Sequence, residues 1–267
     1  MNLDAYFARI GWEGARTATR PVLEGLLDRH MRHIPFENFD VLLGKPPSLD
    51  LAALEDKLVT RKRGGYCYEH TTLFVHVLAE LGFTVKTHSA RVVIMTPREQ
   101  SPRTHMFATV LAGADTSFEP ALLIDPGFGG LAPRKAVRVD GTPSGGHRLV
   151  AAEGAMRDRG ALALEHGHQR LWISSMEHDN PIDFVMANHF TATWGQSPFV
   201  NRIMARAFTD DGEVRISNRD VTWTREGQSE TWVLADRRAL RQVVATHFGF
   251  DLPALESVRV PSIPEWT

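Results

Sequence analysis

The residue of this chain best suited to covalent chemistry is its single cysteine, Cys67. It follows the turn-forming segment Arg63-Gly64-Gly65 and begins an apolar pattern with helical spacing. The unpaired N–H groups and the positive dipole end of a helix N-terminus favour a thiolate, whereas a free cysteine with a pKa of ~8.5 is mostly protonated at neutral pH. Arg63 adds positive charge nearby. We therefore interpret Cys67 as a candidate nucleophile, the alternative being an inert buried cysteine.

A nucleophilic thiolate needs a base, and the base needs a group that orients it. His105 opens a predicted strand after a proline-rich turn, and Asp125 ends the apolar run Ala121–Ile124. A carboxylate at the end of a buried strand needs a partner, which a histidine N–H provides. The spacing supports a triad of Cys67, His105 and Asp125, but it fits equally well an Asp125 that only caps its own turn.

Two neighbours of the cysteine are rival candidates. His70 lies three residues after Cys67 on the same predicted helix, but no group that would orient its ring is evident. We expect it to be a partly exposed residue of the first turn. Glu69 suits the positive end of the helix without any catalytic role.

The elements that position these residues follow from periodicity. Helical spacing predicts helices around Leu23–His30, Leu51–Val59 and Cys67–Leu81, the last ended by Gly82. A further helix is expected at Asp183–His189, an extended stretch at Pro198–Met204, and a last helix at Arg237–Phe248.

Alternating valine-rich segments predict many short strands in the middle and tail of the chain. They are Thr84–Met95, Met106–Leu111, Ala121–Asp125, Arg148–Ala152, Ala161–Leu164, Gln169–Ile173, Val214–Ile216, Val221–Trp223 and Thr231–Leu234. Turn clusters such as Gly113–Ser117 separate them. The order of helices, then strands, then a mixed tail predicts an α+β protein of three regions, with boundaries near residues 85 and 190.

Composition narrows the class of protein. The 267 residues have 43% apolar and 23% charged side chains and a formal net charge of −2, so no basic field favours nucleic acid or an acidic membrane. No apolar run approaches the ~20 residues of a membrane span, and the first residues do not resemble a secretory signal. A lone thiol excludes an internal disulfide and a cysteine-only zinc site, and we expect a cytoplasmic protein without a metal or permanently bound cofactor.

Several segments together resemble one family. The string RGGYCYEHT at 63–71 is similar to the active-site motif Arg-Gly-Gly-x-Cys-x-Glu-x-Asn of the arylamine N-acetyltransferases. Segments that fit the rest of that family's pattern cover essentially the whole chain. They are HIPFENFDVL at 33–42, LGFTVKTHSARV at 81–92, THMFATV at 104–110, LIDPGFGG at 123–130, NHFTATWGQSPF at 188–199 and HFGFDLP at 247–253.

The resemblance implies a fold with a cysteine-protease-like catalytic core. A helical bundle (1–85) would carry the cysteine, a β-barrel (86–190) the histidine and aspartate, and an α/β lid (191–267) would close over them. It also implies a ping-pong reaction, in which acetyl passes from acetyl-CoA to Cys67 and then to an arylamine, arylhydrazine or N-hydroxyarylamine. His105 would move the protons, and Asp125 would hold its ring.

By the same likeness Phe128 would line the amine pocket, with Phe36 and Phe39 as neighbours or as plain core residues. The loop glycines, Gly127, Gly129 and Gly130, would let the backbone approach CoA, although a tight turn explains them almost as well.

The sequence departs from the family pattern at two positions. Thr71 stands where the motif has Asn, and Pro126 replaces the usual Val after Asp125, which removes a backbone N–H and stiffens the turn. We expect an altered loop near the pocket and an unusual amine preference.

Three other functions remain open from the residues alone. A related amide synthase would use the same triad with another donor and acceptor. A cysteine protease or transglutaminase-like hydrolase would cleave acyl bonds in peptides. A non-catalytic binding protein would keep the thiol buried and unreactive.

Overall fold

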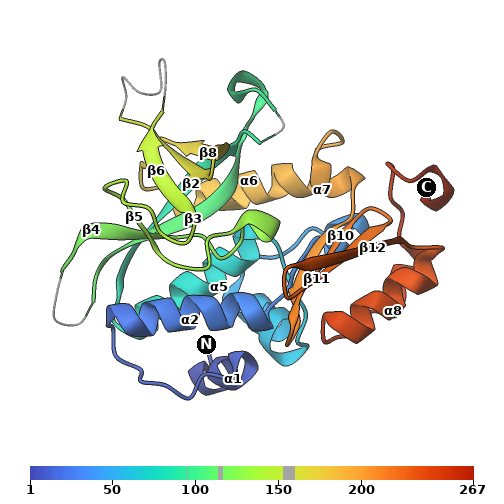
Figure 1. Ribbon diagram of the computed structural model, residues 1–267, viewed down its shortest axis with the longest axis horizontal. Coiled ribbons are helices and arrows are strands. Elements are labelled where there is room, and N and C mark those ends of the chain that lie inside the picture. Colours follow the sequence, from blue (N-terminus) through green and yellow to red (C-terminus); the bar gives the residue numbers. More distant parts are fainter. Residues whose placement is uncertain (95, 114–116, 153–159) are drawn as a thin grey trace. The chain divides into compact units, whose positions relative to one another are not determined.

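The computed structural model describes residues 1–94, 96–113, 117–152 and 160–267 (Figure 1). The chain divides into two compact units, each assembled from separate stretches. The first unit comprises Met1–Trp12, Arg29–Glu69 and Asn188–Thr267, and the second comprises Glu13–Asp28 and His70–Ala187. The division of the chain at residues 85 and 190 stays a prediction.

Three helices contain points at which the chain passes from one unit to the other. They are α2 (Arg20–His33), α5 (Cys67–Glu80) and α6 (Pro181–Thr193). Cys67 therefore lies near the end of the Arg29–Glu69 stretch of the first unit, at the start of a helix that continues into the second unit.

The first unit combines short helices with a five-stranded antiparallel sheet. Its helices are α1 (Leu3–Ile10), α3 (Phe39–Leu42), α4 (Leu51–Leu54), which continues into a π-helical turn (Glu55–Thr60), α7 (Pro198–Asn201) and α8 (Arg237–His247). Its strands are β1 (Phe36–Glu37), β9 (Met204–Phe208), β10 (Gly212–Ser217), β11 (Asp220–Arg225) and β12 (Gln228–Val233), hydrogen-bonded in the order β1-β9-β10-β11-β12.

Helix α8 covers the sheet of the first unit (Figure 1). Leu240 and Val244, one turn apart, share a core with Val214 and Ile216 of β10. The carboxylate of Asp236 caps the start of the helix by accepting the N–H of Ala239.

The second unit is built around a seven-stranded antiparallel sheet. The strands are β2 (Thr84–Val92), β3 (Arg103–Ala112), β4 (Ser117–Ile124), β5 (Val137–Arg138), β6 (His147–Ala151), β7 (Leu162–His166) and β8 (Gln169–Ser174). Their order is β5-β4-β3-β2-β8-β7-β6, and the two end strands, β5 and β6, contact each other. The sheet therefore curls into a nearly closed barrel around buried residues such as Phe107, Leu123 and Trp172.

This arrangement confirms the predicted mixture of helices and a β-barrel. The predicted helix from Cys67 is α5, and Gly82, with φ +89°, follows its end in the left-handed conformation. The expected extended stretch from Pro198 is wrong at its start, because Ser197 accepts the N–H of Phe199 and caps the short helix α7. Met95 and residues 114–116, part of the predicted strand and turn, lie outside the described residues.

Among the helices of the described residues, none has the length and apolar character that crossing a membrane requires.

Candidate active site

Two glycines bring the segment before Cys67 against the chain at β1. The N–H of Gly65 donates to the carbonyl of Pro35 at 3.2 Å, and the N–H of Glu37 donates to the carbonyl of Gly65 at 2.8 Å. A Cβ on Gly64 would lie 2.1 Å from the oxygen of Pro35. Neither glycine has a positive φ, so an unusual turn conformation is not the reason for glycine here. Gly64 is required by the close approach of the Pro35 backbone, and a Cβ on Gly65 would lie 2.7 Å from Oε2 of Glu69.

Glu69 fixes the start of α5 from within its first turn. Its Oε2 accepts the backbone N–H of Tyr66 at 3.1 Å, the residue immediately before the helix. This is the half of a capping box in which an acidic side chain at the third helical position reaches back to the residue before the first turn. The contact holds the peptide that leads into Cys67. The side chain of Cys67 is buried.

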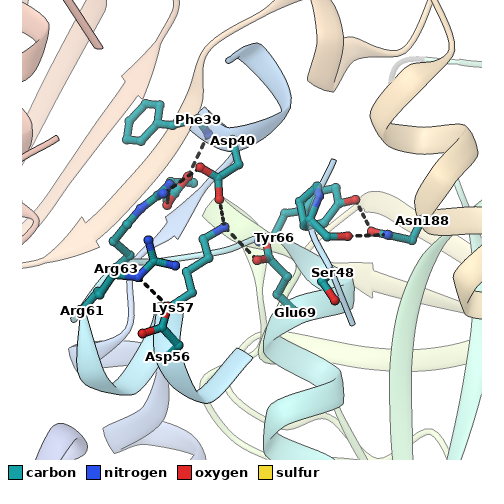
Figure 2. A network of polar contacts seen from close by, with 12 residues as sticks. Phe39, Asp40, Ser48, Asp56, Lys57, Arg61, Arg63, Tyr66, Glu69 and Asn188 are labelled. Carbon is teal, nitrogen blue, oxygen red and sulfur yellow. Dashed lines mark hydrogen bonds and ion pairs between the residues drawn. The ribbon is translucent and has the colours of Figure 1, made fainter. Parts of the chain in front are cut away.

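Behind this turn lies a buried network of five charged side chains (Figure 2). Arg63 donates to Glu37 at 2.7 Å and to Asp40 at 2.6 Å. Lys57 contacts Asp40 and Glu69, each at 2.7 Å. Three carboxylates thus enclose two cations. The positive charge of Arg63 is matched by two of these carboxylates.

The network shifts the protonation of its members. Burial alone lowers the pKa of Lys57, but the carboxylates, Glu69 first, outweigh it and hold that pKa above its usual range. The pKa of Asp40 lies below its ordinary value because Lys57 and Arg63 outweigh burial. Burial raises the pKa of Glu69 to about 7, against the opposing effect of Lys57. Glu69 is the member whose charge changes near neutral pH.

The second unit holds a hydrogen-bonded histidine–aspartate pair. His105 on β3 and Asp125, directly after β4, are both buried, with Nε2 of the histidine 2.8 Å from Oδ2 of the aspartate. The indole Nε1 of Trp172 on β8 donates to the same oxygen at 3.0 Å. A carboxylate oxygen accepts hydrogen bonds, so Nε2 of His105 is the donor in this pair.

Aromatic rings enclose this pair. The ring of Phe128 meets the ring of His105 edge to face at 4.9 Å, from the loop after Asp125. Phe107, two residues after His105 on β3, stacks on Trp172 at 4.3 Å. The histidine is thus held between packed side chains, with its ring plane set by the pair with Asp125.

Thr71 connects α5 to the strand that carries the histidine. Its hydroxyl donates to the backbone carbonyl of Met106, adjacent to His105, at 3.1 Å. Thr71 stands where the resembling motif has Asn, and this bond shows what its side chain does in this protein. Because Thr71 lies four residues after Cys67, the two residues project from the same face of α5.

The other predicted site residues lie as follows. Phe36 is half-buried and faces Phe199, with ring centroids 6.4 Å apart, whereas the ring of Phe39 is fully buried in the core of the first unit. His70 is buried as well, so the expectation that it is partly exposed is wrong.

The loop after Asp125 contains the three glycines that the family resemblance predicts to approach CoA. Gly129 has φ +69° and begins a short 3₁₀ turn to Leu131, while Gly127 is buried and Gly130 is half-buried. The backbone conformation of Gly129 by itself favours glycine.

Sequence reasoning missed Trp172 and Lys57, the partners of Asp125 and Glu69. Both belong to segments with no motif, and the buried position of a charged residue such as Lys57 is not visible in local sequence. The alternation of β8 predicts a buried face, but not which donor on it meets a carboxylate 47 residues away.

Comparisons with known proteins point to one family. A family model described as N-acetyltransferase matches residues 20–257. The arylamine N-acetyltransferase of Mycobacterium tuberculosis is 36% identical over 94% of this chain and 90% of that protein. A Salmonella typhimurium relative, named as an arylamine N-acetyltransferase and N-hydroxyarylamine O-acetyltransferase, is 33% identical over 92% of this chain and 88% of its own length.

Solved structures give the same result. The Mycobacterium marinum arylamine N-acetyltransferase in complex with CoA matches with a TM-score of 0.84 and 32% identity, over 95% of this chain and 94% of that one. Fold, motifs and whole-length similarity therefore coincide, and the chain belongs to the arylamine N-acetyltransferase family.

Proposed function

We propose that this protein transfers an acetyl group from acetyl-CoA to an arylamine through a thioester on Cys67, with His105 and Asp125 completing the catalytic triad. The observation that carries the proposal is the hydrogen bond from Thr71 to Met106. It ties the helix that begins with Cys67 to the residue next to His105.

Helix geometry relates the position of Thr71 to that of Cys67. Residues four apart on an α-helix are neighbours, ~6 Å apart along the axis. Cys67 therefore projects from α5 one turn before Thr71 and on the same face. We infer that His105 serves the Cys67 thiol through Nδ1, since Nε2 is bonded to Asp125.

In the first half-reaction the Cys67 thiolate attacks the thioester carbonyl of acetyl-CoA. The C–S bond to CoA breaks, and the departing CoA thiolate takes a proton from the imidazolium of His105. Asp125 stabilises that imidazolium through its buried carboxylate. Backbone N–H groups, including that of Cys67, would stabilise the oxyanion.

In the second half-reaction the amine nitrogen attacks the acetyl group on sulfur. His105 accepts the proton that the nitrogen loses, and the Cys67 thiolate departs. The same steps acetylate the oxygen of an N-hydroxyarylamine, which the name of the Salmonella typhimurium relative supports. An arylhydrazine would react through its terminal nitrogen in the same way.

The loop after Asp125 would meet both substrates. Phe128 lies against the His105 ring, so it would line the pocket for the aromatic acceptor. Gly127, Gly129 and Gly130 would let the backbone approach CoA, a role that the CoA complex of the M. marinum relative supports. Phe36 would be a further neighbour of the acceptor, and for Phe39 its core position favours plain packing.

The experiment is a measurement of free CoA thiol with acetyl-CoA and an arylamine, in wild type and in Cys67→Ala. The proposal predicts thiol release that depends on the amine and is absent from the variant, with acetylated amine formed in equal amount. Thiol release at the same rate without amine would indicate a hydrolase. Release no faster than in the variant would rule out acetyl-CoA as the donor.

A further inference from the structure

We propose that Trp172 is a positioning residue for the catalytic pair, holding Asp125 in the orientation in which it acts on His105. This inference rests on the proposed function. The observation behind it is that the indole N–H and the imidazole N–H donate to one carboxylate oxygen, Oδ2 of Asp125, at 3.0 Å and 2.8 Å.

The environment of Asp125 explains why it needs a second donor. The residue has no exposed surface, and no side-chain or backbone group of the described residues donates to its other oxygen, Oδ1. Burying a carboxylate away from water is unfavourable unless hydrogen bonds compensate. Among the described residues, Trp172 and His105 are the two side chains that donate to it, and only His105 changes its protonation during the proposed reaction.

An indole suits this role better than other donors. It only donates, so it requires an acceptor at Oδ2. It carries no charge, so it leaves the negative charge of Asp125 uncompensated for the imidazolium, whereas a lysine or arginine would cancel much of it. Rotating the carboxylate away from His105 would break the indole bond as well.

The indole is itself fixed in position. Trp172 is fully buried, and its ring stacks on Phe107 at 4.3 Å with 25° between the planes. Phe107 follows His105 by two residues on β3, so both side chains leave the same face of the strand. The stacked rings of Trp172 and Phe107 therefore fix the indole donor next to Asp125, on the strand face that also carries His105.

The test uses Trp172→Phe, which removes the N–H and keeps an aromatic ring for the stack. The pH dependence of Cys67 alkylation by iodoacetamide is the readout, since it needs no acetyl-CoA. We expect the pH of half-maximal rate to rise by about one unit and the rate at pH 7 to fall roughly 5- to 10-fold. Trp266→Phe, the same change at another buried tryptophan, is the control and should leave the profile unchanged.

A double-mutant cycle separates positioning from packing. In an Asp125→Asn background the Trp172→Phe change should have almost no further effect on the profile, because its route of action is already removed. An unchanged profile in the single variant, or effects that add in the double variant, would overturn the proposal.

A measurement on the unsubstituted tryptophan covers the case in which Trp172→Phe does not fold. Asp125→Asn should shift one of the six indole N–H resonances in a ¹H–¹⁵N spectrum far more than the others; six equal, small shifts would contradict the bond. The proposed function fails separately: a wild-type protein that takes no acetyl group on Cys67 refutes the transferase, while the alkylation profiles still decide the role of Trp172.

Discussion

At the scale of single residues, Thr71 links α5 to β3 within the second unit. Its hydroxyl satisfies the carbonyl of Met106 within the buried interior of the second unit. A threonine can do this only because α5 and β3 pack closely at that point. The departure from the family motif is thus accommodated by a short direct hydrogen bond to the backbone.

Thr71→Val removes this hydroxyl while keeping the shape of the side chain. We expect a loss of about 1–3 kcal/mol in unfolding free energy, since a buried carbonyl loses its donor. Acetylation of Cys67 should slow as well, because the histidine strand is no longer tied to the helix. Urea unfolding and a single-turnover acylation assay measure the two effects.

The adjacent threonine provides the matched control. The hydroxyl of Thr72 lies 3.8 Å from the sulfur of Met106, a weak acceptor, so Thr72→Val should change stability and acylation far less. Equal effects of the two substitutions would show that the bond to the Met106 carbonyl is unimportant.

At the scale of elements, the start of α5 depends on how closely two backbone segments approach. A methyl group at Gly64 would lie 2.1 Å from the Pro35 oxygen, and the same oxygen accepts the N–H of Gly65. A backbone atom cannot move aside as a flexible side chain does.

Gly64→Ala should therefore destabilise the protein by more than about 3 kcal/mol, beyond the usual range for overpacking. Gly195→Ala is the control, because a Cβ there meets no atom within 4 Å. Chemical unfolding of both variants tests the prediction, and a Gly64→Ala protein as stable as Gly195→Ala would contradict the close approach of the two segments.

The helix start also has a predicted pH dependence, through Glu69. Burial raises its pKa to about 7, whereas the unfolded chain releases that proton near the ordinary value of 4.5. Between these pH values the folded state binds more protons, so this group's contribution to stability decreases as pH rises. Glu69→Gln keeps an oxygen for the Tyr66 N–H and removes the titration.

We expect the stability of wild type relative to Glu69→Gln to fall as pH is raised from 5 to 8. Glu80→Gln, an exposed position at the end of the same helix, should show no such trend. Thermal unfolding across this pH range provides the comparison. A difference that is constant or grows with pH would mean that Glu69 is ionised throughout.

At the scale of the whole molecule, periodicity and motif predicted what is local. The apolar pattern from Cys67 to Leu81 predicted α5, and the alternation at Met106–Leu111 predicted part of β3 (Arg103–Ala112), the strand that holds His105. Both predictions rest on the spacing of apolar residues along a single helix or strand, which reveals its buried face. The family resemblance predicted that helices and a β-barrel occur in the same chain, which the structural neighbours support.

The remaining features of the site depend on contacts between distant residues. Lys57 meets Glu69 twelve positions away, and Trp172 meets Asp125 across the barrel, because strand register and the packing of a π-helical turn place them there. No pattern within one segment encodes either contact. His70 illustrates the same limit, since helical position alone did not reveal its burial.

The central claim, that the only sulfhydryl carries the acetyl group under the control of His105 and Asp125, is tested most directly by the mass of the intact protein after incubation with acetyl-CoA alone. We predict that wild type gains one acetyl group on Cys67, that Cys67→Ala gains none, and that His105→Ala and Asp125→Asn gain it at least 100-fold more slowly. Acetylation of the His105 variant at the wild-type rate, or an unmodified wild-type protein, would contradict the account.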